Sequence, residues 1–290
     1  CIPTMKFLPI GSGSCGNCYY LESCGTAIII DLGIGIRAFK RHIRDFGLSL
    51  PLIKAVIVTH DHTDHIKGVG PFAIEQHTPV YASELVHRGI DRNRMMTKKI
   101  PQEQKVFTTL DTPFEVGPFR ITPFAVMHDS NDCNGYFIEI TQPEPPEDLF
   151  DTAKACAQPS EDEPLTFCII TDCGTFSDNL IPYIKRARYL VIEANFDAQM
   201  LKTGPYPDRL KRRIMNGHGH LDNAICAKML AQHLTPSTKH VWLCHLSEEN
   251  NHPAIAQSTI KNAIDESALT EKPEVSVLRR NAPTGIFILK

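Results

Sequence analysis

A cluster of histidines and aspartates directly after an apolar strand places the strongest constraint on how this chain folds. Residues 54–59 read KAVIVT, and their unbroken apolar middle is typical of a strand that is buried on both faces. The next residues bring His60, His62, Asp64 and His65 within six positions. A lone histidine after a strand is usually structural, whereas four ligand-type side chains at the end of a buried strand indicate a metal site.

The spacing within this cluster predicts two metal ions rather than one. In extended backbone His60 and His62 point to the same side, so they can share one ion. Asp64 and His65 begin the next turn and point elsewhere, where they can bind a second ion. Two ions about 3.5–4 Å apart can hold both the attacking and the leaving oxygen of an in-line displacement.

Four more ionisable residues end apolar strands elsewhere in the chain, which is where α/β folds place their ligands. They are Asp31, His128, Asp172 and His245. Each one alone is compatible with an ordinary loop residue. Together with the central cluster they predict further metal ligands.

The order of strand-like and helix-like segments predicts a layered α/β architecture, and the length of 290 residues allows one large domain or two ordinary ones. We expect strands at 5–10, 18–23, 26–31, 54–59, 119–126, 135–140, 165–171, 189–193 and 240–244, and near residues 80, 106 and 114. We expect helices at 37–46, 179–186, 208–215, 222–234 and 253–265, with Asp222 or Asn223 capping the fourth.

Residues 142–164 hold five prolines, seven acids and one base, which predicts an acidic insertion between two strands.

The net charge of −3 excludes a nucleic-acid binder that is basic all over. The acidity is local, however, because residues 142–164 carry −6 and the rest of the chain carries +3. Residues 185–213 carry +5. Two interpretations of this basic stretch stay open, a solvated helix face and a wall beside an anionic substrate.

The composition also predicts the compartment. No apolar run approaches the roughly 20 residues that span a bilayer, and the first residues lack the pattern of a secretion signal. The ten cysteines are too sparse for a disulfide scaffold, and Cys15 and Cys18 lack a matching pair at zinc-finger spacing. We therefore expect a cytoplasmic protein with no membrane anchor.

The ordered motifs resemble those of the metallo-β-lactamase fold superfamily: a strand-ending aspartate, T-H-x-H-x-D-H, then a histidine, an aspartate and a last histidine. The resemblance implies a single domain over residues 1–290, a four-layer αββα sandwich with the site at one edge of two sheets. It implies that one ion is held by His60, His62 and His128, and that a second ion is held by Asp64, His65 and His245. It also implies that Asp172 bridges the two ions and that Asp31 orients the histidine loop.

Three further stretches resemble the YycJ/WalJ group of that superfamily, whose members are nuclease-like. They are GSGSCGNCY at 11–19, RRIMNGHGHLDN at 212–223 and HLSEENN at 245–251. Cys15, Asp222 and the acidic insertion depart from the group pattern, but none of them is a predicted ligand. In these stretches His220 is our candidate proton donor to the leaving oxygen, and Ser14, Asn17 and Asn223 are our candidates for holding phosphate oxygens.

The resulting hypothesis is a hydrolase, a phosphodiesterase that cleaves nucleic acid with a metal-bridging hydroxide attacking phosphorus in line. The resemblance implies a 5′-to-3′ DNA exonuclease. The ligands favour zinc or manganese and also allow iron or nickel. The alternatives are a metal-dependent hydrolase of a small thioester, lactone or cyclic phosphate, and a metal-binding nucleic-acid module without activity.

Overall fold

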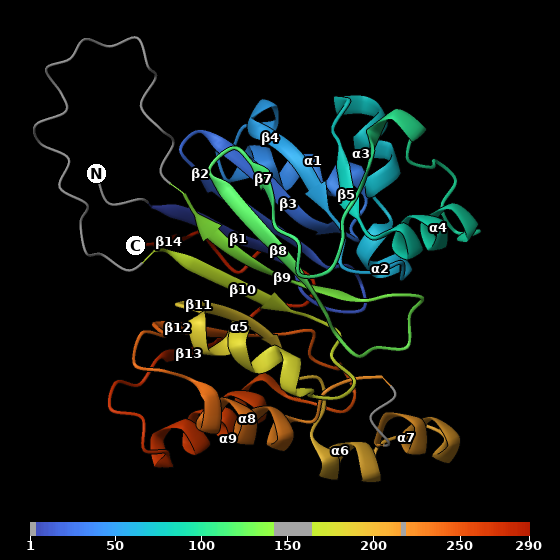
Figure 1. The fold of residues 1–290 in the computed structure, drawn as a ribbon. Helices are drawn as coiled ribbons and strands as arrows, with labels where there is room; N and C mark the ends of the chain where they lie inside the picture. The colour runs from blue at the N-terminus through green and yellow to red at the C-terminus, as the bar shows by residue number, and fades with distance from the viewer. Residues whose placement is uncertain (1–3, 142–163, 216–218) are drawn as a thin grey trace, which may run out of the picture.

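The computed structural model describes residues 4–141, 164–215 and 219–290. Two seven-stranded sheets pack face to face between two layers of helices (Figure 1). This arrangement confirms the predicted four-layer αββα sandwich. All but the last residue of the predicted acidic insertion lies outside the described residues, and the single domain over 1–290 stays a prediction.

The first sheet has the strand order β14-β1-β2-β3-β4-β5-β6. Its strands are β1 (Met5–Gly11), β2 (Cys18–Ser23), β3 (Thr26–Leu32), β4 (Ile53–Ile57), β5 (Val80–Ala82), β6 (Lys105–Phe107) and β14 (Phe287–Leu289). Strands β3 to β6 run parallel, so their carboxyl ends meet at one edge of the sheet.

The second sheet has the order β13-β12-β11-β10-β9-β8-β7. Its strands are β7 (Phe114–Val116), β8 (Phe119–Ala125), β9 (Asn134–Ile140), β10 (Thr166–Ile170), β11 (Tyr189–Glu193), β12 (His240–Cys244) and β13 (Glu274–Val277). Strands β10 to β13 are parallel, and the carboxyl ends of β10, β11 and β12 lie next to one another.

Helices cover the outer face of each sheet (Figure 1). They are α1 (Ile36–Asp45), α2 (Thr63–Ile66), α3 (Val69–Gln76), α4 (Glu84–Arg92), α5 (Ile181–Arg186), α6 (Ala198–Thr203), α7 (Asp208–Met215), α8 (Asn223–His233) and α9 (Pro253–Glu266), with short 3-10 helices at Leu50–Leu52, Gln102–Gln104 and Asp178–Leu180. Within the described residues, no helix combines the length and the apolar character needed to cross a lipid bilayer.

Strand alternation explains why both faces of each sheet are apolar. In β3, Ile28 and Ile30 pack between the sheets, while Ala27 and Ile29 pack against the helices of the first half. A strand buried on both faces reads as a continuous apolar run, which is the pattern that predicted β3, β4 and β10.

The predicted helix over 208–215 matches α7, and Asp222 caps α8 by accepting hydrogen bonds from the amides of Ala224 and Ile225. Strand β4 ends at Ile57, two residues earlier than predicted. The reason is that the Thr59 amide leaves the sheet and donates to the Asp31 carboxylate at 2.8 Å.

Candidate metal centre

The loop after β4 carries the central motif, and Asp31 holds its start in place. Thr59 donates two hydrogen bonds to the Asp31 carboxylate, from its amide and from its hydroxyl, both at 2.8 Å. His62 is in extended backbone at the N-cap position of α2, without a side-chain capping hydrogen bond, and the helix contains Asp64 and His65. The motif therefore changes from loop to helix where the sequence predicted a turn.

Two donor groups, meaning sets of side chains whose atoms could bind a metal ion, lie at the site. The first consists of three imidazoles. Ligand atoms of His60, His62 and His128 all lie within 4.8 Å of one another. Burial lowers the pKa of all three, so they are neutral, which is the form that binds metal. His60 Nε2 is buried and has no hydrogen-bond partner among the described residues, so this nitrogen is available to bind a metal ion.

The second group combines a carboxylate with two imidazoles. Ligand atoms of Asp64, His65 and His245 lie within 4.8 Å of one another. Asp64 Oδ2 is 3.7 Å from His65 Nε2 and 3.5 Å from His245 Nε2. Asn17 also reaches this group, because its side-chain nitrogen lies 2.9 Å from His65 Nε2.

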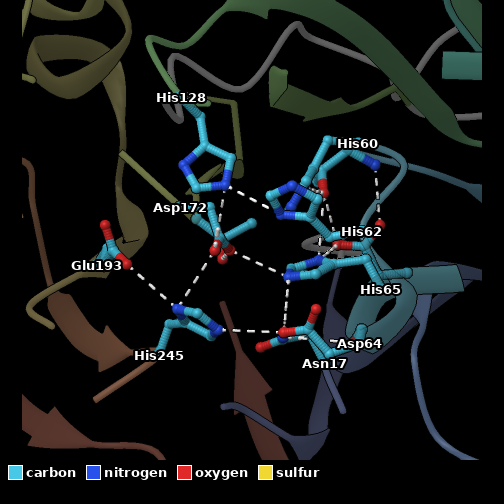
Figure 2. A network of polar contacts seen from close by, with 12 residues as sticks. Asn17, His60, His62, Asp64, His65, His128, Asp172, Glu193 and His245 are labelled. Atoms are coloured by element: carbon cyan, nitrogen blue, oxygen red, sulfur yellow. Dashed lines mark hydrogen bonds and ion pairs between the residues drawn. The ribbon is translucent and has the colours of Figure 1, made fainter. Parts of the chain in front are cut away.

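Asp172 lies between the two groups (Figure 2). Its Oδ2 is 3.1 Å from His65 Nε2, and its Oδ1 is 3.3 Å from His245 Nδ1 and 3.8 Å from His128 Nε2. Although burial raises the pKa of Asp172, the imidazoles of His245 and His65 hold that pKa well below its usual range. Asp172 is therefore an ionised carboxylate within reach of both groups.

Three residues at the site have left-handed backbone although none of them is glycine. The φ angles of Asp31, Asp172 and His245 are 56°, 50° and 54°, and each residue lies at the carboxyl end of a strand. Such a conformation costs of order 1–3 kcal/mol per residue and tends to occur at functional sites. Here it turns each side chain out of the strand and into the site.

Buried acceptors fix the orientation of the imidazoles. Asp31 Oδ2 accepts from His65 Nδ1 at 2.7 Å, and the Gly219 carbonyl accepts from His128 Nδ1 at 2.7 Å. In both rings Nδ1 is bonded to the acceptor, and Nε2 contacts other site residues: His65 Nε2 lies 3.1 Å from Asp172 Oδ2, and His128 Nε2 lies 3.2 Å from His62 Nδ1. Partners of this kind raise the affinity of a metal site by holding its ligands in place.

Glu193, the last residue of β11, is a site residue that sequence reasoning missed. It is fully buried; its Oε2 accepts from the amides of Cys173 (2.8 Å) and Leu221 (3.0 Å). Its Oε1 lies 2.7 Å from His220 Nδ1 and 3.2 Å from His245 Nδ1. Burial raises the pKa of Glu193, but His220 and these hydrogen bonds bring it below the usual value. The available signal was an acid ending an apolar strand, the same signal that identified Asp172.

His220 lines the cavity in front of the donor groups, and its side chain is 27% exposed. Its Nδ1 bonds Glu193, and its Nε2 has no hydrogen-bond partner among the described residues. His220 Nδ1 is also 3.9 Å from Asp172 Oδ1. The structure thus brings this predicted residue to the site, with one ring nitrogen directed to a buried carboxylate.

The three predicted phosphate-binding residues differ in position. Ser14 is exposed and lines the cavity. Asn17 is fully buried, and its amide nitrogen donates to the Gly13 carbonyl as well as approaching His65. Asn223 is also buried, and its side chain pairs with that of Asn251. It is not among the described residues that line the cavity.

The cavity has a volume of about 550 Å³ and two kinds of lining residue. Metal-binding donors and His220 form one part of the lining. The other part is an apolar cluster of Phe196, Leu201, Tyr206, Leu210 and Ile214. Arg213 also lines the cavity and pairs with Asp129, the neighbour of His128.

The charge balance of the site fits divalent cations. Asp64, Asp172 and Glu193 all have lowered pKa values and are buried or nearly so. Buried charges of one sign need compensation by a partner or a metal. Burial alone would lower the pKa of His245, but Asp172 raises it to about 10, which shows the strength of the negative field. The mixed imidazole and carboxylate donors suit zinc and other first-row metals.

The family follows from a comparison with known proteins. The model of the β-lactamase superfamily domain matches residues 26–246, which include every residue of the two donor groups and Asp172. The chain belongs to the β-lactamase superfamily. The resemblance predicted from the motifs is thereby confirmed.

Two curated relatives match almost the whole chain. Exodeoxyribonuclease YycJ of Bacillus anthracis is 29% identical over 262 residues, covering 90% of both chains. Exodeoxyribonuclease WalJ of Streptococcus pneumoniae serotype 2 is 28% identical over 265 residues, covering 91% of this chain and 90% of the relative. The metallo-β-lactamase fold protein YhfI of Bacillus subtilis has a solved structure that aligns with a TM-score of 0.66 at 18% identity, covering 99% of both chains.

These comparisons and the donor clusters together identify this superfamily member as a metal-dependent hydrolase. They confirm the predicted enzyme class.

Proposed function

We propose that this hydrolase is a phosphodiesterase that degrades DNA from the 5′ end, with two divalent metal ions in the centre described above. The observation that carries the proposal is the similarity over nine-tenths of the chain to two proteins named exodeoxyribonuclease. The geometry supports it, because an ionised aspartate lies within reach of two donor groups beside a histidine with a free ring nitrogen.

Each donor group fits one ion. We assign His60, His62 and His128 to the first ion, Asp64, His65 and His245 to the second, and Asp172 to both. Zinc or manganese suits this set best, and iron or nickel also fits it. Such ions supply a nucleophile from water near neutral pH and offset the charge of the phosphate.

The protein's own residues hold the reacting groups. Glu193 holds Nδ1 of the His220 ring, and the His220 side chain lines the cavity, where its Nε2 can donate a proton to the leaving oxygen of the DNA strand. Ser14 lines the same cavity and offers its hydroxyl to a phosphate oxygen. Asn17 and Asp31 contact His65 and Thr59, and so act as positioning residues for the second donor group.

Asn223 fits a structural role better than a phosphate contact, since its amide pairs with Asn251 below the site. We further propose a cytoplasmic location. The eight cysteines among the described residues are free thiols, and four of the six that are buried lie in strands or directly next to one, as expected in a reducing compartment.

The proposal is tested with end-labelled single-stranded and double-stranded DNA and RNA, incubated with the protein and a series of divalent metals. We expect mononucleotides released progressively from the 5′ end of DNA, and no release by Asp172→Ala. Asp45→Ala is the matched control, because Asp45 is exposed at the end of α1 and contacts only its neighbour Arg44. Degradation by Asp172→Ala would identify a contaminating nuclease, and preference for S-lactoylglutathione over DNA would refute the proposal.

A further inference from the structure

A small apolar cluster lines the same cavity as the metal-binding donors. It consists of Phe196, Leu201, Tyr206, Leu210 and Ile214, and we call it the Tyr206 shelf. The cluster is separate from the three large cores of the sandwich. Helices α6 and α7, which carry most of it, lie at the lower right of the molecule, beyond α8 (Figure 1).

The shelf presents an unsatisfied aromatic side chain to the cavity. Phe196, Leu201 and Ile214 are buried and form its base, whereas Tyr206 and Leu210 are partly exposed. Of the seven tyrosines, all within the described residues, Tyr206 alone has neither a ring contact nor a hydrogen bond at its hydroxyl. The other tyrosine hydroxyls or rings are engaged at Tyr19, Tyr20, Tyr81, Tyr136, Tyr183 and Tyr189.

The charges around the shelf select a ligand that is anionic at one end. Arg213 lines the cavity, and Arg209 and Arg212 are exposed on the same helix. Besides the metal-binding donors, three acids line the cavity: Asp129, which pairs with Arg213, and Glu248 and Glu249, which disfavour an anion near them. A phosphate is therefore favoured at the metal-binding donors, with a neutral flat group at the shelf.

We propose that the Tyr206 shelf binds the nucleobase of the nucleotide whose phosphate is cleaved. This inference rests on the proposed function and adds a subsite to it. A nucleotide joins a phosphate to a flat aromatic group, and stacking on tyrosine tolerates every base because each one has a π-face. A cavity of about 550 Å³ lies within the range of pockets for single small ligands, so the base enters it unpaired.

Binding is the direct test, with oligonucleotides whose terminal linkages are phosphorothioates that resist cleavage. The terminal nucleotide carries 2-aminopurine, whose fluorescence falls when it stacks. We expect the wild type and Tyr206→Phe to quench this fluorescence with similar Kd values. Tyr206→Ala should lose the quenching and bind about 5- to 140-fold more weakly.

An oligonucleotide with an abasic terminal nucleotide is the matched control. Because it has no base to stack, its Kd should be the same for the wild type and Tyr206→Ala, which also shows that the variant site is folded. The proposed role of the shelf would be refuted if Tyr206→Ala quenched the fluorescence as strongly as the wild type. It would also be refuted if Tyr206→Ala lost as much affinity for the abasic strand as for the strand with the base. If the wild type degrades DNA while the shelf test fails, only the subsite is wrong; if the wild type neither binds nor degrades DNA, the proposed function is wrong as well.

Discussion

Replacing Glu193 by glutamine tests whether this buried carboxylate controls His220. The substitution keeps the size of the side chain and removes its charge. A glutamine oxygen in the place of Oε2 can still accept from the amides of Cys173 and Leu221. The side-chain NH₂ then faces His220 and His245 and cannot accept from either ring, so both charge-assisted contacts are lost.

The size of the effect follows from these contacts. A hydrogen bond to a charged group contributes about 1.5–3 kcal/mol. If the His220 contact matters only when the proton is donated, its loss lowers kcat about 10- to 150-fold and leaves KM nearly unchanged. The His245 contact is longer, at 3.2 Å, so we expect the metal content to be retained.

The assay compares kcat and KM on end-labelled DNA for the wild type, Glu193→Gln, His220→Gln and the double variant, together with metal content by mass spectrometry. If Glu193 acts through His220, the double variant should be no slower than His220→Gln, because residues that act as a unit are not additive. Multiplied losses in the double variant, or a wild-type kcat for Glu193→Gln, would refute the reasoning.

Three further predictions concern the metal centre and its supports. Asp31→Asn removes the charged acceptor of His65 Nδ1 and should weaken metal binding about 10- to 100-fold in equilibrium dialysis; an unchanged affinity would contradict the positioning role. In Gly33→Ala the new Cβ lies 1.6 Å from the Asp64 carbonyl oxygen, so the free energy of unfolding in urea should fall by about 3 kcal/mol, whereas Gly35→Ala, with open space around it, should change it little. For the metal-free protein, the free energy of unfolding should fall as the pH drops below about 4.5, because the pKa values of Asp172 and Asp64 are depressed in the folded state. It should also fall as the pH rises from about 6.5 towards 10, because folding raises the pKa of His245 to about 10 and its stabilising proton is lost in this range. His245→Gln should reduce the alkaline decline without abolishing it, because Asp172 and Asp31 also hold the pKa of His65 above its usual value although burial lowers it; a decline equal to that of the wild type would show that His245 does not contribute.

The residues of the candidate metal centre could be predicted from the sequence because their signal is local. His60, His62, Asp64 and His65 follow one buried strand, and Asp172 and His245 end two others. Residue type and position relative to a strand are both visible in a sequence. Glu193 satisfies the same rule but follows no recognised motif, so it could have been predicted and was not.

The Tyr206 shelf could not be predicted, because its members acquire their role only by packing. Nothing in the sequence of α6 or α7 shows that Tyr206 faces the same cavity as His220. The buried position of Asn17 also depends on tertiary structure, since its amide reaches Asp64 and His65 nearly fifty residues away. Helix α3 was missed because residues 69–76 include Gly70 and Pro71 and lack a helical apolar period.

The two donor groups have a mechanical consequence for the whole molecule. Each group takes residues from both halves of the sandwich: His60 and His62 follow a strand of the first sheet, and His128 follows a strand of the second. Asp64 and His65 likewise come from the first half, and His245 from the second. A bound ion therefore joins the two sheets at their edge like a removable cross-link, so that loss of metal affects the docking of one half on the other as well as the chemistry.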